Sequence, residues 1–172
     1  TNDYGILYEL NLTGNVITKL QDFSAHGSNG SQSGLTYAHG KIYGMAGPGA
    51  LGTHGILFEY DPITNVFTKK LDFAGINGSQ PKGDLVLVGN KLYGMTAKGG
   101  AGDKGVLFEY DFLTNTLTKK IDFTGNNGSD PKGSLVEYGG ILYGLTSLGG
   151  TSDRGVLFEY DISSGILAAK KD

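Results

Sequence analysis

The stretch Gly105–Tyr110, GVLFEY, decides the fold of this 172-residue chain because it recurs at a fixed interval. The copies stand 50 residues apart and keep the order glycine, aliphatic residue, leucine, aromatic residue, glutamate and a large apolar residue. The other three copies are GILYEL at Gly5–Leu10, GILFEY at Gly55–Tyr60 and GVLFEY at Gly155–Tyr160. A period of this length is typical of repeat architectures in which each repeat forms one supersecondary unit.

Each repeat is predicted to contain four short strands. Val, Ile, Leu, Tyr, Phe and Thr fill the apolar runs, and Gly, Asn, Asp, Ser and Pro fill the gaps between them. A Gly89-Asn90 turn separates the first two strands, and a glycine-rich loop at 97–104 precedes the third. No segment keeps a helical period for three turns. In the third repeat the strands are expected at 85–88, 91–96, 106–111 and 117–123.

The third strand indicates how these sheets pack. Val106, Phe108 and Tyr110 share one face, and the opposite face also begins with an apolar residue, Leu107. A sheet with apolar residues on both faces is expected to lie between two neighbours. Lys119-Lys120 marks the fourth strand as the outer edge, since lysines prevent pairing between exposed edges. The short apolar first strand is then innermost, which predicts the four-stranded antiparallel blades of an all-β propeller.

The repeats divide the chain into about 3.5 blades, or fourteen strands. Residues 1–24 read as a half blade that holds only strands three and four, and complete blades are expected at 25–74, 75–124 and 125–172. Because propellers have roughly four to eight blades, a partial ring is expected. We interpret the sequence as a fragment of a longer propeller, with the missing blades supplied by the parent chain. Pairing with a second chain is the alternative.

Composition excludes several classes of function. The net charge of −3 gives no basic stripe for nucleic acid, and no apolar run is long enough to span a membrane. The absence of cysteine excludes thiol catalysis, disulfides and cysteine-ligated zinc. Gly47–Gly52 and Gly100–Gly105 match G-x-G-x-x-G, but a strand is expected after each, whereas a dinucleotide site needs a helix. We therefore expect no cofactor.

The titratable residues favour structural roles. Glutamate recurs once per blade at Glu59, Glu109 and Glu159, whereas a catalytic pair needs two different environments. An ion pair with a nearby lysine is therefore expected, and the tyrosines in phase at 43, 93 and 143 are expected in the core with a bonded hydroxyl. A metal site shared by His26 and His54 is the alternative interpretation of these loop histidines. These two and His39 are expected to be solvated loop residues, with no metal and no catalytic residue.

Strand direction predicts where a ligand would bind. Loops between strands two and three, and between consecutive blades, emerge on one face and are long, whereas the other loops are short. Binding residues concentrate on long loops held by a rigid scaffold. The face has few aromatic residues, so a polar small molecule, a glycan or a protein partner is expected. The candidate ligand-binding residues on this long-loop face are His54, Lys82, Asp103, Lys104, Lys132, Asp153 and Arg154.

Two families resemble this sequence. Glu59–Phe67, EYDPITNVF, resembles a kelch segment, although the kelch tryptophan is replaced by Phe67 and the double glycine is displaced to Gly99-Gly100. The order Leu92–Thr96, Gly99-Gly100 and Gly105–Phe108 is more similar to the bacterial Gloeobacter–Verrucomicrobia (GloVer) tandem repeats, as is Gly128–Leu135. That resemblance covers nearly the whole chain and implies an extracellular or cell-surface bacterial protein.

The sequence thus favours a non-catalytic extracellular binding or scaffold module of a bacterial secreted or surface protein over an enzyme. A propeller hydrolase acting on polysaccharide is the first alternative. It would require one blade to carry polar residues that the other blades lack, converging at one end of the ring. A passive spacer or secretion cargo is the second alternative.

Overall fold

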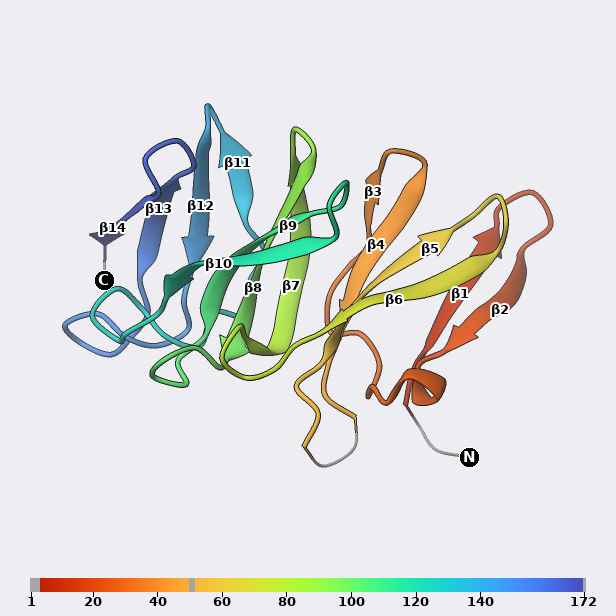
Figure 1. Ribbon diagram of the computed structural model, residues 1–172, viewed down its shortest axis with the longest axis horizontal. Coiled ribbons are helices and arrows are strands. Elements are labelled where there is room, and N and C mark those ends of the chain that lie inside the picture. Colours follow the sequence, from red (N-terminus) through yellow and green to blue (C-terminus); the bar gives the residue numbers. More distant parts are fainter. Residues whose placement is uncertain (1–3, 50–51, 172) are drawn as a thin grey trace.

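The computed structural model describes residues 4–49 and 52–171, which form fourteen β-strands and one short 3₁₀ helix, η1 (Figure 1). The elements are β1 (Ile6–Asn11), β2 (Val16–Asp22), η1 (Phe23–His26), β3 (Thr36–Ala38), β4 (Lys41–Ala46), β5 (Ile56–Asp61), β6 (Val66–Asp72), β7 (Ser79–Val88), β8 (Lys91–Lys98), β9 (Val106–Asp111), β10 (Thr116–Asp122), β11 (Val136–Tyr138), β12 (Ile141–Leu145), β13 (Leu157–Asp161) and β14 (Ile166–Lys171).

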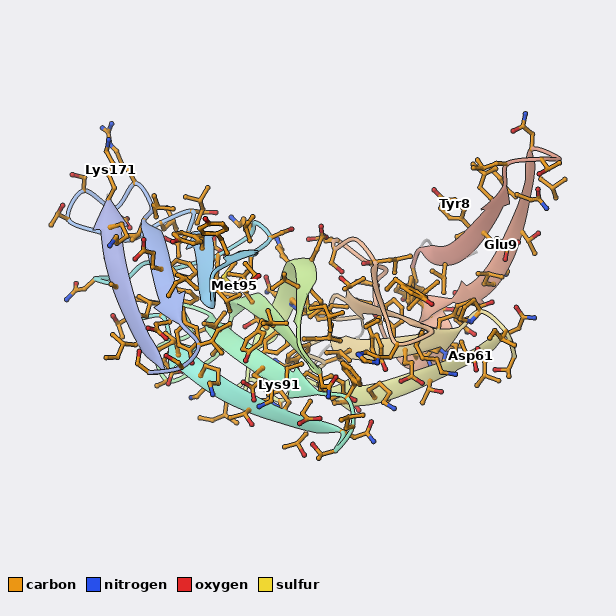
Figure 2. All side chains as sticks on the ribbon, turned by 90° about the horizontal axis from the view of Figure 1, so that it is seen from above. Tyr8, Glu9, Asp61, Lys91, Met95 and Lys171 are labelled. Carbon is orange, nitrogen blue, oxygen red and sulfur yellow. The ribbon has the colours of Figure 1, made fainter. Side chains whose placement is uncertain are left out.

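The strands form one two-stranded and three four-stranded antiparallel sheets, each in chain order. β1 and β2 make the half blade, and β3–β6, β7–β10 and β11–β14 make the complete blades. The sheets follow one another along an open arc, with the lysine-bearing strands β6 and β10 on its convex side (Figure 2). The all-β propeller fold and the partial ring predicted from the period are therefore confirmed.

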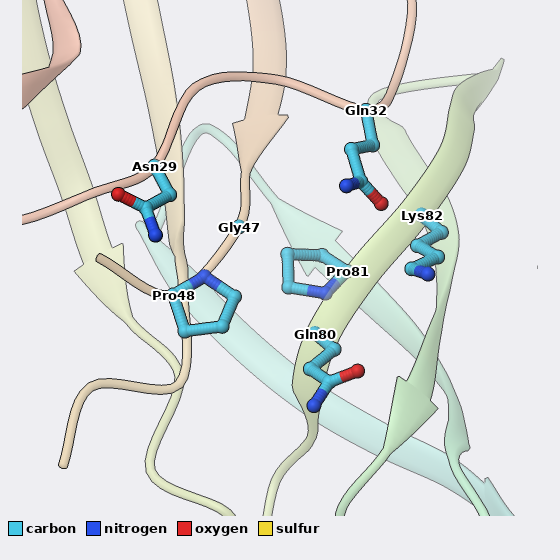
Figure 3. A pocket seen from close by; sticks show the side chains of 7 residues that line it. All are labelled: Asn29, Gln32, Gly47, Pro48, Gln80, Pro81 and Lys82. Carbon is cyan, nitrogen blue, oxygen red and sulfur yellow. The ribbon is translucent and has the colours of Figure 1, made fainter. Parts of the chain in front are cut away.

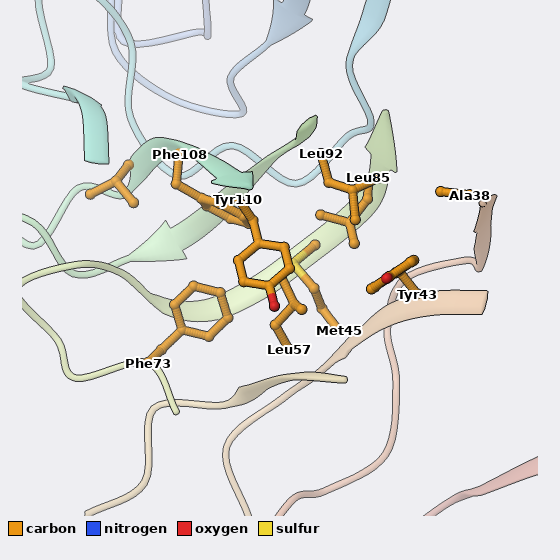
Figure 4. Close-up of a cluster of buried hydrophobic side chains, with 10 residues drawn as sticks. Ala38, Tyr43, Met45, Leu57, Phe73, Leu85, Leu92, Phe108 and Tyr110 are labelled. Atoms are coloured by element: carbon orange, nitrogen blue, oxygen red, sulfur yellow. The ribbon is translucent and has the colours of Figure 1, made fainter. Parts of the chain in front are cut away.

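Apolar residues of the strands pack between consecutive blades. Val106, Phe108 and Tyr110 of β9 belong to the core cluster shared with the blade before it, in which Leu57 and Phe73 also lie (Figure 4). Leu107, on the opposite face of β9, belongs to the cluster shared with the following blade. The interpretation of a sheet covered on both faces is thus confirmed.

One aromatic contact recurs at every junction between blades. Phe73 packs against Phe108 with ring centroids 5.4 Å apart. The pairs Phe23–Phe58 and Phe123–Phe158 have the same separation, 5.4 Å. The phenylalanine directly after the fourth strand therefore helps to hold each blade against the next, because tilted or edge-to-face rings at this distance attract one another.

A ladder of hydrogen bonds joins neighbouring blades at or just before their first strands. The N–H of Gly34 donates to Oδ1 of Asp84 in the next blade, and the N–H of Asp84 donates to Oγ of Ser134, 2.9 Å away, in the blade after that. These residues stand 50 positions apart. Each step therefore links equivalent positions of neighbouring blades.

The first repeat departs from the others after its fourth strand. Gly75 and Gly78 form a tight bridge in the second repeat, as Gly125 and Gly128 do in the third. In the first repeat η1 occupies this place, with Asp22 capping its start and Gly27 ending it in a left-handed conformation, φ 68°. In the first repeat the NGSQ at Asn29–Gln32 stands 48 rather than 50 residues before the NGSQ at Asn77–Gln80, and η1 accommodates the two additional residues.

Between residues 4 and 171, leaving out 50 and 51, no helix is long and apolar enough to cross a bilayer.

Candidate functional site

The long loops all lie at one end of the blades, as strand direction predicts. The β4–β5, β8–β9 and β12–β13 loops descend together with the connections between blades, whereas the β3–β4, β7–β8 and β11–β12 hairpins lie at the opposite end (Figure 1). Six of the seven candidate residues therefore lie in loops or connections of the long-loop face, whereas Lys82, expected in a loop, lies within β7 and pairs with Met95 of β8.

The two candidate aspartates close their own loops. Oδ1 of Asp103 accepts the N–H of Gly99 at 2.8 Å, and Oδ1 of Asp153 accepts that of Gly149 at 2.7 Å. The hydroxyl of Thr53 accepts the N–H of Gly49 in the same way in the first complete blade. Both aspartates have positive φ, 52° and 53°, which Asp tolerates better than most residues. Their carboxylates therefore hold the loop shape.

Three of the candidate basic residues also make contacts within the fold. Nζ of Lys104 donates to the carbonyl of Thr124 at 2.9 Å, and Lys132 forms an ion pair with Asp130 at 2.6 Å. The ring of His54 is hydrogen-bonded to Oγ of Ser79 at 3.1 Å. The contacts of Lys104 and His54 link a loop between two strands to the segment that leads into the following blade. The ion pair of Lys132 stabilises such a segment.

Two candidate cations remain. Arg154 is exposed at the tip of the β12–β13 loop, and Lys82 is half-buried near the start of β7. Within the described part of the chain, neither side chain has an ion pair or a hydrogen bond to another side chain.

Two of the three histidines are less solvated than expected. His26 stacks on Phe67 with ring centroids 4.4 Å apart, and burial lowers the pKa of its imidazole. The ring of His39 lies 4.9 Å from that of Phe112 in the next blade. The expectation of solvated loop histidines is therefore wrong for His26 and His54, which are half-buried, whereas His39 is exposed as expected. No three His, Asp or Glu residues of the described ranges are close enough together to hold a metal ion.

The recurrent glutamate is bound inside each complete blade. Glu109 accepts the hydroxyl of Tyr93 at 2.7 Å and pairs with Lys91 and Lys120. Burial opposes its ionisation, but the hydrogen bonds from Lys91 and Tyr93 prevail and lower the pKa of Glu109. Burial together with this glutamate raises the pKa of Tyr93. Glu59 and Glu159 likewise pair with lysines, so the predicted ion pairs are confirmed.

A polar pocket opens between the first two complete blades (Figure 3). It has a volume of about 170 Å³ and is lined by Asn29, Gln32, Gly47, Pro48, Gln80, Pro81 and Lys82. The connection before β3 supplies two carboxamides, the loop after β4 supplies Gly47 and Pro48, and β7 supplies the rest. Of these residues only Lys82 was among the sequence candidates. The sequence does contain one signal for this pocket. Gln80 stands where the following repeat has Asp130, so a neutral side chain takes the place of a charged one.

The family model of the Gloeobacter/Verrucomicrobia repeat matches residues 1–170. The chain belongs to this repeat family. The resemblance drawn from the glycine and tyrosine spacing is thereby confirmed for the repeat family, and the comparisons give no kelch relationship. No curated protein is similar enough in sequence to count as a relative.

Solved structures share the β-propeller-like fold of this family member. TolB from Acinetobacter baumannii has a TM-score of 0.63 at 15% identity, over 96% of this chain and 37% of the TolB chain. A puromycin-hydrolyzing peptidase from Mycobacterium tuberculosis has a TM-score of 0.53 at 13% identity, over 76% of this chain and 19% of that chain. The repeat chain therefore spans well under half of each of these proteins.

Proposed function

We propose that the chain is a non-catalytic binding or scaffold module of a secreted or surface bacterial protein, and that further blades of the same repeat type cover its two end faces. The exposure of those end faces is the observation that supports this. On the half blade, Tyr8 is 56% exposed, whereas Phe58 and Phe108 at the equivalent positions are 0% exposed. Ile6 and Leu10 are exposed beside Tyr8.

The last blade has a matching exposed face. Leu157 is 39% exposed, whereas Leu57 and Leu107 at the equivalent positions are 0% exposed. Leu145 is 59% exposed, and its equivalent Met95 is 2% exposed. Contiguous apolar residues of this kind mark interaction surfaces.

The partner chemistry follows from the junctions inside the chain. At each junction, one blade offers the residues of the Leu107 type and the next offers those of the Phe108 type. The last blade exposes residues of the Leu107 type, and the half blade exposes residues of the Phe108 type. A groove of about 310 Å³ between the half blade and the first complete blade is lined by Ile6, Leu7, Tyr8, Phe23, Ser31, Ser33, Leu35 and Phe58. Blades of the same repeat type are the surfaces already fitted to these residues.

An appended blade tests this proposal. A second copy of residues 123–172 placed directly after Asp172 continues the 50-residue period. We expect the melting temperature to rise by about 5 °C, because Leu145 and Leu157 become buried. The matched control carries an aspartate in the appended copy at the position equivalent to Phe158, and it should give no rise. An equal melting temperature for both extended chains would refute the interface.

Secretion or surface display is the second part of the proposal. It is supported by the implication of the family resemblance, and the chain contains no cysteine whose redox state would restrict its compartment. Fractionation of the source bacterium, followed by detection with an antibody to this chain, should find it in the culture medium or at the cell surface. Detection only in the cytoplasmic fraction would contradict this part.

A further inference from the structure

The polar pocket between the first two complete blades differs from the equivalent crevice one repeat later. In the later crevice, Lys132 forms an ion pair with Asp130 at 2.6 Å. In the pocket, Lys82 occupies the position of Lys132, but Gln80 occupies the position of Asp130. The carboxylate that neutralises the lysine is thus replaced by a neutral amide. Lys98 replaces Pro48 in the later repeat, so the two crevices also differ on their other wall.

The backbone at the exchanged residue is the same in the two crevices. Gln80 and Asp130 both have positive φ, 53° and 52°. The N–H of Gln80 donates to the carbonyl of His54 at 2.9 Å, and that of Asp130 donates to the carbonyl of Lys104 at 2.9 Å. At residues 80 and 130 the change of side chain is therefore a change of charge at the same local conformation, and the two backbones diverge after the lysines, where Gly83 has a φ of 71° and Gly133 lacks a positive φ.

The pocket residues have a definite chemistry. Among the lining residues that the structure describes, Lys82 supplies the only formal charge, and Asn29, Gln32 and Gln80 supply carboxamides that both donate and accept hydrogen bonds. Pro48 and Pro81 supply apolar faces, and Pro81 is buried against the wall of the pocket (Figure 3). One amide group is partly engaged, since Nδ2 of Asn29 donates to the carbonyl of Gly49 at 3.3 Å.

We propose that this pocket binds a sugar acid of hexuronate type. An unneutralised ammonium recognises one carboxylate, whereas a phosphate dianion is usually held by a bidentate arginine or by several backbone N–H groups. Carboxamides pair with neighbouring hydroxyls because each can donate to one and accept from another. The proline faces contact the C–H face of the ring. A cavity of roughly 150 Å³ holds the six-membered ring of benzene. The pocket of about 170 Å³ therefore has room for the six-membered ring of a hexuronate, whose polar substituents extend to its rim.

This assignment deepens the proposed binding function, and it does not depend on how the end faces are covered. The appended-blade experiment leaves the pocket untouched. Failure of the one therefore leaves the other standing.

The test is titration of the full chain with sodium glucuronate, followed by NMR of the amide signals of Gly47, Gln80 and Lys82. We expect saturable shifts with a Kd of about 1–10 mM, and binding of glucose about tenfold weaker or more, because glucose lacks the carboxylate. Sodium acetate should also bind about tenfold more weakly, since it lacks the hydroxyls. A glucuronate trimer tests whether the pocket recognises a sugar acid at the end of a glycan chain. If it does, the trimer binds at least as well as the monomer. Weaker binding of the trimer assigns the pocket to free sugar acids.

Two variants and one matched control make the test specific. Gln80→Asp gives Lys82 the partner that Lys132 has, so glucuronate affinity should fall about tenfold or more while the fold is retained. Lys82→Met should have the same effect. Lys132→Met, at the equivalent position one repeat later, should leave glucuronate affinity unchanged. The proposal is overturned if the parent chain shows no saturable shifts, if Lys82→Met binds as well as the parent, or if all three variants weaken binding equally.

Discussion

The central blade β7–β10 and the half blade β1–β2 carry the same motif, but the motif acquires its interactions only in the central blade. Glu109 is 7% exposed and is held by Tyr93, Lys91 and Lys120. Glu9, its equivalent on β1, is exposed, and position 20 on β2 is a leucine instead of the lysine found at 120. The comparison teaches that the glutamate of the repeat needs partners from the strands on both sides of its own. In the half blade, which has only two strands, the glutamate stays exposed to solvent.

The largest difference between the two regions should appear in aromatic packing. Phe108→Ala removes a fully buried ring that packs against Phe73, and it should lower the free energy of unfolding by about 3–5 kcal/mol. Tyr8→Ala, at the equivalent exposed position, should cost about 1 kcal/mol or less. Urea unfolding at neutral pH measures both. Equal costs would mean that the half blade is already covered in the isolated chain.

The buried glutamate should give the next largest effect. Glu109→Gln leaves Lys91 and Lys120 without their carboxylate inside the blade, and it should lower the free energy of unfolding by about 2–4 kcal/mol. Glu9→Gln should change it by less than about 0.5 kcal/mol. The same urea series checks both variants, and a cost for Glu9→Gln as large as that for Glu109→Gln would break the comparison.

Acid should remove the advantage of the central blade. The folded-state pKa of Glu109 lies below its ordinary value of 4.5, so its stabilisation is present above that value and is lost as pH falls through the lowered pKa. The stability difference between the parent chain and Glu109→Gln should therefore shrink as pH is lowered from 6 towards 3. Glu9→Gln should track the parent chain over the same range. A difference that stays constant with pH would show that Glu109 contributes through packing alone.

The smallest effect concerns one hydroxyl at the end of the third strand. The hydroxyl of Tyr110 donates to Oδ1 of Asn115 at 2.9 Å, whereas Gly165 stands at the equivalent position of the last blade and the buried hydroxyl of Tyr160 has no partner in the described ranges. Gly165 has a φ of 72°, which asparagine tolerates.

Gly165→Asn should therefore raise the free energy of unfolding by about 1 kcal/mol, because it satisfies a buried group. Asn115→Gly should lower it by a similar amount. In the half blade Leu10 replaces the tyrosine, so Asn15→Gly should have little effect. Thermal unfolding distinguishes the three variants, and a destabilised Gly165→Asn chain would argue against the missing hydrogen bond.

Much of the fold could be predicted because it repeats. Period-two alternation placed β9 at its observed bounds, Val106–Asp111, and the paired lysines identified the outer strand. β7 is longer than expected, since it begins at Ser79 and includes Pro81. Pro81 and Gly83 read as a loop in the sequence, but a shift of register between Lys82 and Val86 lets Ser79, Pro81 and Lys82 pair with β8. Only contacts across the sheet determine such a pairing.

The candidate site was less predictable. The long-loop face followed from strand direction, but the function of a loop aspartate depends on whether a nearby N–H reaches it. Asp103 and Asp153 bond to glycine N–H groups four residues earlier, which a loop sequence does not reveal. The polar pocket forms between residues about 50 positions apart. It differs from the crevice one repeat later because Gln80 is neutral where Asp130 is charged.

The hydrogen-bond ladder from Gly34 through Asp84 to Ser134 also bears on how such a protein can grow in evolution. Asp84 is a donor toward one neighbour and an acceptor toward the other, so a single repeat carries both halves of the connection. Duplication of a gene segment that encodes 50 residues around Asp84 would therefore insert a blade that joins both neighbours without a compensating mutation. Gly34 has no side-chain oxygen, so it can donate along the ladder but cannot receive from a preceding blade. New blades of this ancestry would be inherited more readily after the first complete blade than before it.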